Sequence, residues 1–384
     1  MISVAENGYR VEHVTTGARQ LAAVEALIER AVASDTTQLT VLHRDRPLLR
    51  WRTVDRGRPL HVQSITKSFV ALAILILRHE GKLTSLDQPV GEIVPAWADA
   101  ERRAITVRHL LLHISGLDTT WNGTAFERSR QKGSVASRVL DRPVRQPPGQ
   151  RFAYDNAGYQ VLALVAETLA GESLATYLDE RLFTPLEIDE YDWLRDEEGH
   201  VIGPYGLSLH ADALAKVGAC LAAEGKWRGD MVLPPDLVEA AIAPRVQRRF
   251  EIIERERLEI DGLPQRGAER RYELGEHAYG YGWWHGRTDH PLIVSTDLEK
   301  RSQAQQTTPR LDAYQQVDTP HACFSARGEG NRTLIVVPEL QLVAARLLSG
   351  DLDPYDTSRD DLLDLEAHLE LLTSAADTDA GAST

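Results

Sequence analysis

A serine and a lysine three residues apart, Ser64 and Lys67, form a pair whose spacing suits covalent chemistry. On a helix, residues at this spacing lie on the same face one turn apart, so hydroxyl and amine would be neighbours. A lysine enclosed in a low-dielectric cleft has a lowered pKa and can accept the serine proton. The pair therefore predicts a nucleophile, Ser64, with Lys67 as its proton acceptor. A helix-capping serine followed by a surface lysine is the alternative, since about one Ser-x-x-Lys arises by chance at this length.

The surroundings of the pair favour the catalytic interpretation. An apolar run from Phe69 to Leu77 follows it, so Ser64 stands where a short strand would lead into a buried helix. Further along, the proline- and glycine-containing loop 147–158 places Tyr154 and Asn156 two residues apart just before another helix. Loops of this kind present side chains into clefts. A half-buried packing tyrosine and a helix N-cap are the alternative roles for these two residues.

The two ends of the chain share one pattern. Each end combines a helix of amphipathic spacing with two short apolar strands joined by a turn. The economical arrangement places both hairpins in one antiparallel sheet, with the terminal helices on its face and the middle of the chain inserted between its halves. The predicted elements are a helix at 19–33, strands at 38–43 and 48–53, strands at 333–337 and 341–348, and a helix at 359–373.

The middle of the chain is predicted to be mainly helical. Four segments have apolar residues at helical spacing, and each ends at or near a glycine, a common helix terminator. We therefore expect one α+β domain of two lobes: a sheet lobe from 1–60 plus 305–373, and a helical lobe from 61–304. The four helical segments are 67–79, 106–113, 157–170 and 212–223.

Three stretches break these periodic patterns. Residues 245–271 are densely charged and 287–320 are polar, and both are expected as surface excursions. A polar segment as long as the second is unusual in a compact domain unless it covers a site, so we expect it to border the active site. The small polar residues 374–384 are expected to be a disordered tail.

Composition narrows the expected partners and compartment. The chain has 43 Lys and Arg against 57 Asp and Glu, and its net charge of −14 would repel nucleic acid. The N-terminal residues lack the features of a signal peptide and the longest apolar run is too short to cross a bilayer, so a cytoplasmic protein without a membrane segment is expected. Cys220 and Cys323 are expected as free thiols. Metal-ligand spacings and phosphate-binding loops are lacking, so neither a metal nor a cofactor is expected.

Three consecutive segments resemble the signatures of the serine β-lactamase and penicillin-binding protein family in its class C, esterase-like branch. They are residues 63–71, 105–117 and 147–158, in the family's order. Two further segments, Phe183 to Leu186 and Tyr279 to Trp284, resemble other landmarks of the branch. The resemblance therefore covers most of residues 15–350. The branch includes esterases, 6-aminohexanoate-dimer hydrolases and transacylases.

The resemblance implies a β-lactamase/transpeptidase-like fold and assigns roles to individual residues. Ser64 would be the acylated nucleophile, Lys67 its proton acceptor, and Tyr154 the group that shuttles protons to the leaving group. Asn156 would position the substrate through its amide. His113 corresponds to a structural landmark at the end of a helix.

The third family signature, on the strand that lines the cleft, departs from the pattern. Ala326 stands where a lysine or histidine is usual, although Arg327 could supply the charge if the register slips. Gly328 keeps the glycine of the signature. The oxyanion hole needs only backbone N–H groups, those of Ser64 and Glu329, so acyl transfer remains expected while recognition of a β-lactam carboxylate does not.

Four functions are compatible with these residues. We favour hydrolysis of a small-molecule ester or amide through an acyl-enzyme. The second is transfer of the acyl group to an amine or alcohol acceptor in secondary metabolism, which the sequence does not separate from the first. β-Lactamase or D-Ala-D-Ala carboxypeptidase activity ranks lower, because of the altered third signature and the missing export signal. A catalytically dead binding protein ranks last, since Ser64, Lys67, Tyr154 and Asn156 occur together.

Overall fold

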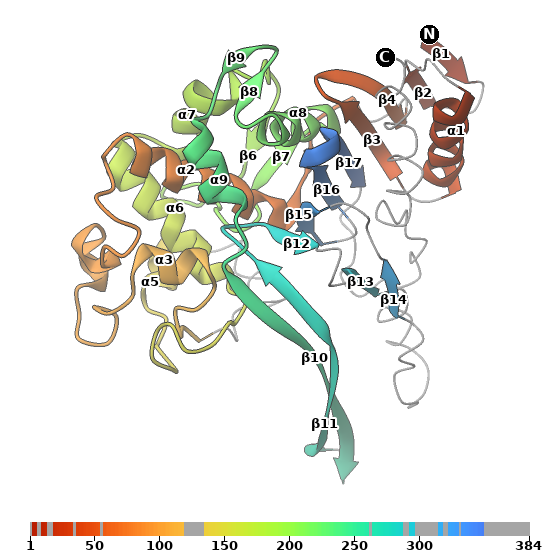
Figure 1. Ribbon diagram of the computed structural model, residues 1–384. Coiled ribbons are helices and arrows are strands. Elements are labelled where there is room, and N and C mark those ends of the chain that lie inside the picture. The colour runs from red at the N-terminus through yellow and green to blue at the C-terminus, as the bar shows by residue number, and fades with distance from the viewer. Residues whose placement is uncertain are drawn as a thin grey trace.

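Strands from the first and last described parts of the chain share one ten-stranded antiparallel sheet (Figure 1). The computed structural model describes residues 2–5, 9–13, 18–33, 36–53, 57–118, 134–260, 263–286, 292–295, 314–317, 322–329 and 332–348. The strand order is β1-β2-β4-β3-β17-β16-β15-β12-β11-β10. Its strands are β1 (Ile2–Ala5), β2 (Tyr9–His13), β3 (Thr36–His43), β4 (Arg46–Thr53), β10 (Val246–Ile260), β11 (Leu263–Tyr279), β12 (Trp284–Gly286), β15 (Cys323–Gly328), β16 (Arg332–Val337) and β17 (Leu342–Leu348).

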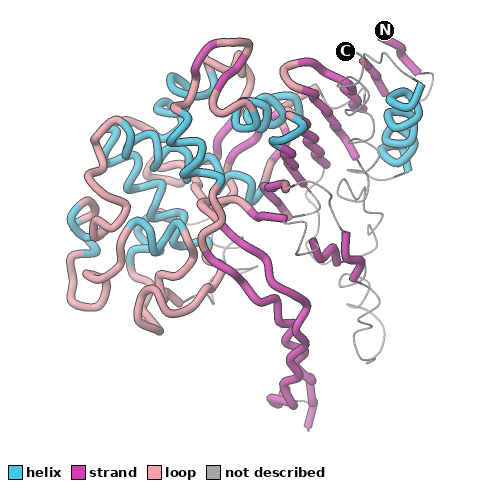
Figure 2. The backbone as a smooth tube through the Cα atoms, viewed as in Figure 1, coloured by secondary structure: helices cyan, strands magenta, loops and turns pink. Residues whose placement is uncertain are grey.

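Helices and short strands fill the middle of the described chain (Figure 2). The helices are α1 (Ala18–Ala33), α2 (Thr66–His79), α3 (Val107–Leu111), α5 (Val135–Leu140), α6 (Asn156–Ala170), α7 (Leu174–Leu178), α8 (Ala211–Ala222) and α9 (Pro235–Ile242). The short strands are β5 (Leu60–His61), β6 (Asp192–Trp193), β7 (Leu207–Leu209), β8 (Lys226–Trp227) and β9 (Asp230–Met231).

The two terminal hairpins meet in the centre of the sheet, as the sequence predicts. β17 pairs antiparallel with β3, with Leu342 opposite His43 and Ala344 opposite Val41. Alternate residues of these strands face opposite sides, so each side of the sheet receives its own apolar surface. One face packs against α1, in a core that includes Leu27 from the helix.

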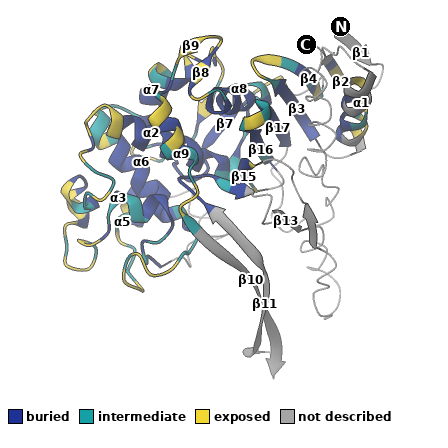
Figure 3. Cartoon of the chain, viewed as in Figure 1, coloured by how far each residue is buried: buried dark blue, intermediate teal, exposed yellow. Residues whose placement is uncertain are grey.

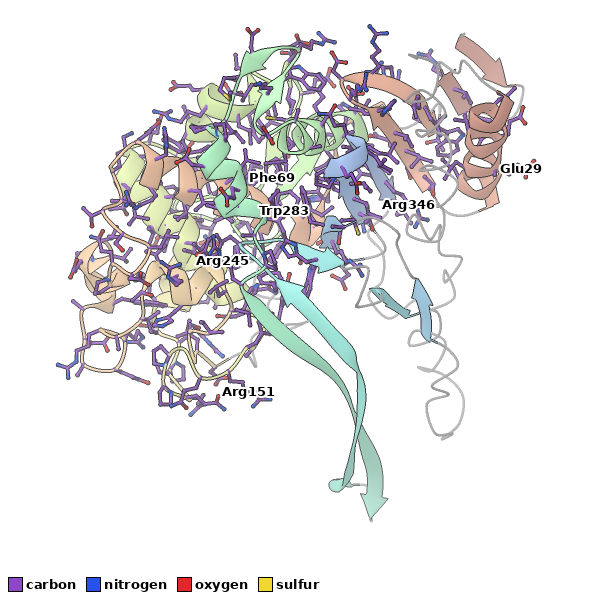
Figure 4. All side chains as sticks on the ribbon, in the orientation of Figure 1. Glu29, Phe69, Arg151, Arg245, Trp283 and Arg346 are labelled. Carbon is purple, nitrogen blue, oxygen red and sulfur yellow. The ribbon has the colours of Figure 1, made fainter. Side chains whose placement is uncertain are left out.

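The other face of the sheet packs against the helical layer (Figure 3). α8 lies across β3, β16 and β17. α2 is buried from Thr66 to Leu77, which explains why it is apolar on every side rather than on one stripe. Figure 4 marks Phe69 of α2 and Trp283, which precedes β12; both belong to this core. The nucleophile helix is therefore held by the interior of the protein.

Residues 245–271, expected as a surface excursion, form strands. They contribute β10 and most of β11, an antiparallel pair that extends away from the rest of the sheet (Figure 2). The helix α9 ends at Ile242, and the sheet strand β10 begins at Val246. Strands of the large sheet therefore begin well before residue 304, where the sequence places the end of the helical lobe.

Several sequence expectations lie outside the described residues. These include the helix at 359–373 and the tail at 374–384. Within the insertion 287–320, the structure describes only β13 (Leu292–Ser295) and β14 (Tyr314–Val317), which pair with each other. Whether this insertion borders the active site stays a prediction.

The described residues also bear on cysteine chemistry, membrane spans and metals. Cys220 and Cys323 are buried free thiols, as expected. No single described helix is long and apolar enough to cross a bilayer; the pair Asn156–Ala170 and Leu174–Phe183 meets the criterion together, across a 73° bend. Across the same ranges, no group of three or more His, Cys, Asp or Glu side chains could hold a metal ion.

Candidate active site

Ser64 lies at the expected strand-to-helix junction. It is the middle residue of a single 3-10 turn, Gln63–Ile65, that leads directly into α2. Gln63 has a φ of 51°, a left-handed conformation that side-chain-bearing residues seldom adopt. The Thr66 hydroxyl holds this turn by donating to the Gln63 carbonyl at 2.7 Å, and it accepts from the Leu207 N–H at 3.2 Å. The half-buried serine is thus fixed at a rigid corner.

Lys67 brings its amine to the serine, as the three-residue spacing predicts. Its Nζ lies 3.1 Å from Ser64 Oγ and donates to the Pro204 carbonyl at 2.9 Å. The side chain is only 1% exposed. This burial lowers the pKa of Lys67 to about 7, although the charges of Asp155 and Glu329 raise it in part. A substantial share of the amine is therefore neutral near pH 7 and able to accept the serine proton.

Tyr154 completes the group. Lys67 Nζ lies 4.8 Å from the centre of its ring. The ring is half-buried between two others: the His113 imidazole, with centroids 4.4 Å apart, and the Trp284 indole, 6.3 Å away and nearly parallel at 20°. The structure therefore brings Ser64, Lys67 and Tyr154 together, although Tyr154 is 87 residues beyond Lys67 in the sequence.

His113 holds the backbone on both sides of Tyr154. Its carbonyl accepts from the Ala153 N–H at 2.8 Å, and its Nδ1 accepts from the Asp155 N–H at 3.0 Å. Since Nδ1 is an acceptor, the neutral ring carries its proton on Nε2, which lies 3.1 Å from the Tyr279 hydroxyl. The residue that the resemblance marks as structural is thus a positioning residue for Tyr154.

Two buried tyrosines continue this chain of hydrogen bonds. The hydroxyls of Tyr279 and Tyr159 lie 3.4 Å apart, and Tyr159 donates to the Leu111 carbonyl at 3.0 Å. Burial raises the pKa of both phenols, so both stay neutral. From the sequence, Tyr279 belongs only to a family landmark, and Tyr159 has no predicted role. Helical periodicity marks Tyr159 as a core position and does not indicate its hydrogen bond.

Asp155 is a site residue that the sequence analysis missed. Its two carboxylate oxygens each accept at 2.9 Å, from the N–H groups of Ala157 and Gly158, so Asp155 is the N-cap of α6. Asn156 is then the first helical residue, and the N-cap alternative for its role is wrong. Burial raises the pKa of Asp155 to about 6. An aspartate two residues before the predicted helix 157–170 was the available signal.

The third signature lies on β15, in a register that does not slip. Ala326 pairs with Leu334 and Arg327 with Thr333. Ala326 is fully buried in the core shared with the helices, so its position supplies no cation to the cleft. Arg327 belongs to the opposite face, where its Nε donates to Ser325 Oγ at 3.2 Å. The slip by which Arg327 would replace the missing cation is therefore not observed.

Arg327 nevertheless shares a face with the aromatic residues of the site. Ser325, its hydrogen-bond partner, is directly opposite Trp284 in the pairing of β12 with β15. Trp284 stacks on Tyr154. Arg327 thus stays a candidate substrate-binding residue on the Trp284 side of the strand.

Gly328 marks the closest approach of β15 to the nucleophile. A Cβ on this residue would lie only 2.4 Å from the Val62 carbonyl oxygen, two residues before Ser64. The end of β15 therefore lies against the junction, and Glu329, the next residue, is exposed there. An oxyanion hole formed by the Ser64 and Glu329 N–H groups stays a prediction.

The sequence model of the family described as Beta-lactamase matches residues 24–368. The chain belongs to the Beta-lactamase family. The resemblance inferred from the sequence is thereby confirmed, and the Beta-lactamase family assignment covers both lobes and every candidate site residue.

Individual curated relatives match the chain over shorter segments than the family model does. Protein flp of Staphylococcus aureus (strain MW2) is 28% identical over 132 residues, which are 33% of this chain and 26% of that protein. Esterase EstB of Burkholderia gladioli is 31% identical over 175 residues, 39% of this chain and 44% of EstB. The chain thus matches less than half the length of either relative.

A solved structure shows the same fold. The putative 6-aminohexanoate-dimer hydrolase from Bacillus anthracis superposes with a TM-score of 0.62 at 17% identity, covering 90% of this chain and 82% of that one. The β-lactamase/transpeptidase-like fold, with mixed helices and an antiparallel sheet, is therefore confirmed.

Proposed function

We propose that the protein is a serine hydrolase that cleaves an ester or amide bond of a small molecule through an acyl-enzyme on Ser64. One observation carries this proposal: an enclosed Lys67 amine, with a pKa of about 7, lies 3.1 Å from the Ser64 hydroxyl. An activated nucleophile requires a base within hydrogen-bond reach whose pKa is near the working pH.

The geometry supports a two-step reaction. Ser64 Oγ attacks the carbonyl carbon while Lys67 takes the hydroxyl proton, and the N–H groups of Ser64 and Glu329 stabilise the oxyanion. The bond to the leaving group then breaks as Tyr154 donates a proton to it and regains one from Lys67. A water attacks the acyl-enzyme with the same groups accepting its proton, and the acid product leaves with Ser64 restored.

An ester or a simple amide fits the site better than a β-lactam. A cation on β15 is what the family signature would use to hold the β-lactam carboxylate, and the buried Ala326 stands in its place. Two similar proteins carry matching names, an esterase and a putative 6-aminohexanoate-dimer hydrolase.

Transfer of the acyl group to an amine or alcohol remains the alternative outcome of the same intermediate. Hydrolysis and transfer differ only in the nucleophile that attacks the acyl-enzyme. Adding hydroxylamine or a primary alcohol to an ester reaction separates them by product analysis. A transacylase would give mostly the amide or new ester at millimolar acceptor, whereas a hydrolase would give mostly the free acid.

The proposal is tested by covalent labelling. A fluorophosphonate should modify Ser64 alone, as intact-protein and peptide mass spectrometry would show, and Ser64→Ala should neither react nor turn over p-nitrophenyl esters. Lys67→Ala and Tyr154→Phe should each slow acylation by orders of magnitude, because they belong to one proton-transfer unit.

Matched controls keep this test specific. The half-buried Ser85 and the exposed Lys82, both just beyond α2, offer the same substitutions away from the site, and Ser85→Ala and Lys82→Ala should label and turn over normally. Labelling that persists in Ser64→Ala, or normal turnover by Lys67→Ala, would contradict the proposal.

A further inference from the structure

A cavity of about 640 Å³ lies between the outer strands of the sheet and the start of α8. Figure 1 labels the elements that enclose it, β2, β3, β4 and α8. Strands β2, β4 and β3 form one wall. The first residues of α8 and the loop 187–190 form the other. Ser64, Lys67 and Tyr154 are not among its lining residues. A ligand here would therefore be separate from the proposed acyl substrate.

Strand register aligns hydrogen-bond donors along the sheet wall. Arg52 of β4 is directly opposite Gln38 on one side and Arg10 of β2 on the other. Directly opposed residues of antiparallel strands point to the same face. All three residues line the cavity. Two guanidinium groups and one amide thus form a single row across three strands.

The neighbouring row shows how an arginine on this wall is neutralised. Arg50 lies two residues before Arg52, on the same face, and its Nε forms a 2.6 Å ion pair with Asp212 of α8. Arg10 and Arg52 have no such acid: neither forms a hydrogen bond or ion pair with the residues that the structure describes. Arg10 and Arg52 are both exposed, and like charges directly opposite one another destabilise a sheet, so an anion between them would be stabilising.

The amide at the end of the row is fixed by its own bonds. Gln38 is buried, accepts from the Ala211 N–H at 2.9 Å, and donates to the Arg58 carbonyl at 3.2 Å. It does not turn away to solvent, and it cannot neutralise Arg52. The row therefore has a rigid end and two guanidinium groups for which the described part of the chain supplies no anion.

Most acidic residues of the facing wall have hydrogen-bond partners of their own. Glu187 accepts from Arg228 at 2.7 Å, and Glu190 lies 2.8 Å from His210 Nε2. Lys216 donates to the Glu187 carbonyl at 2.6 Å. Asp189 is the remaining acid, exposed in the loop. The positive charge available to a ligand is thus concentrated at the Arg10 and Arg52 end of the cavity.

We propose that this cavity binds a small dianion, a phosphate monoester or a dicarboxylate, between the guanidinium groups of Arg10 and Arg52. Each planar guanidinium can hold two anionic oxygens at once, and one dianion between two of them removes the like-charge repulsion. The net charge of −14 means that such binding requires a local arginine site rather than the overall field. This inference goes beyond the proposed hydrolase activity and does not depend on it.

Calorimetric titration of the full chain tests the proposal. Inorganic phosphate, glycerol 3-phosphate and succinate are titrated separately, with sodium chloride holding the ionic strength constant. We expect saturable binding of one dianion per chain. Arg10→Ala and Arg52→Ala should each weaken it by about tenfold or more, since each removes a charge-assisted bidentate contact. Tighter binding of the phosphates identifies a phosphate site, and tighter binding of succinate a dicarboxylate site.

The control and the milder variant come from the same strand. Arg46 of β4 is exposed and does not line the cavity, so Arg46→Ala should bind as the unchanged protein does. Arg52→Lys keeps the positive charge but lacks the planar guanidinium that holds two oxygens at once, so it should bind the dianion with intermediate affinity. Thermal unfolding and p-nitrophenyl ester hydrolysis show that each variant is folded. An absence of saturable binding, or equal affinity in Arg46→Ala and the Arg10 and Arg52 variants, overturns the proposal.

Discussion

The imidazole of His113 lies against the ring of Tyr154, with centroids 4.4 Å apart, while the main chain on either side of Tyr154 is hydrogen-bonded to His113. One residue thus fixes both the ring and the backbone of the group proposed to protonate the leaving group. His113 itself has a φ of 56°. It is held there by the Tyr279 hydroxyl on its other ring nitrogen.

His113→Ala should therefore reduce both stability and acylation. It leaves the Asp155 N–H and the Tyr279 hydroxyl without their buried partner and places alanine at a left-handed φ, at a cost of about 2 to 4 kcal/mol in the free energy of unfolding. Loss of the ring that supports Tyr154 should lower kcat/KM for an ester while KM changes less. Urea unfolding and steady-state kinetics measure the two effects.

His113→Asn is the matched variant. Asparagine adopts a left-handed φ readily and its side-chain oxygen can accept the Asp155 N–H, so it should recover part of the stability and of kcat. If Asn and Ala variants lose activity equally while stability recovers, His113 supports the fold but does not position Tyr154.

The pH dependence of acylation should follow Lys67. Because the amine must be neutral to accept the serine proton, kcat/KM should rise as the pH increases through about 7, the pKa to which burial lowers Lys67, and level off above it. Lys67→Arg keeps a protonated group at every working pH and should lose this step. Ester hydrolysis between pH 5 and about 9 measures the profile.

Two carboxylates should set the position of that profile. Asp155 and Glu329 both raise the pKa of Lys67, Asp155 by more. Asp155→Asn should therefore move the acidic limb to lower pH, while the asparagine still caps α6 through one oxygen. Glu329→Gln should move it in the same direction by less, since Glu329 is exposed and screened by solvent. If the acidic limb stays in place in Asp155→Asn, the Asp155 carboxylate does not act on the pKa of Lys67. Glu92→Gln, which removes an exposed acid elsewhere, is the control and should leave the limb unchanged.

Gly328→Ala should damage the oxyanion site. Its Cβ would lie 2.4 Å from the Val62 carbonyl oxygen, so the end of β15 must move away from the Ser64 junction. Loss of one oxyanion donor costs about 100-fold to 1,000-fold in kcat. Gly57→Ala, where nothing lies within 4 Å of the new Cβ, should leave kcat unchanged. Equal kinetics in the two variants would place the oxyanion hole elsewhere.

Substrate preference should follow Ala326. p-Nitrophenyl esters should be cleaved and nitrocefin hardly at all, because the alanine is buried and supplies no charge for the β-lactam carboxylate. Arg327→Ala tests the candidate cation on the Trp284 side: it should raise KM for esters that carry a carboxylate and leave neutral esters unaffected. Comparable kcat/KM for nitrocefin and neutral esters would contradict the expected preference.

The sequence by itself determined the features that depend on neighbours within a few residues. The i, i+3 spacing of Ser64 and Lys67 fixes their 3.1 Å contact once a helix forms. Alternation and turn residues likewise indicated the four strands of the terminal hairpins, and the aspartate before α6 was available as a cap signal. Local backbone geometry is sufficient for these predictions, because no distant segment has to be placed.

Only the tertiary structure decided which distant segments complete the site. Tyr154 lies between His113 and Trp284, Gly328 against Val62, and Arg52 opposite Arg10, and each contact depends on sheet order or on how a loop returns to the core. The lowered pKa of Lys67 likewise requires burial that no local pattern measures. The pairing of β10 with β11 in the charged segment 245–271 likewise depends on the partner strand, which the expectation of a surface excursion did not specify.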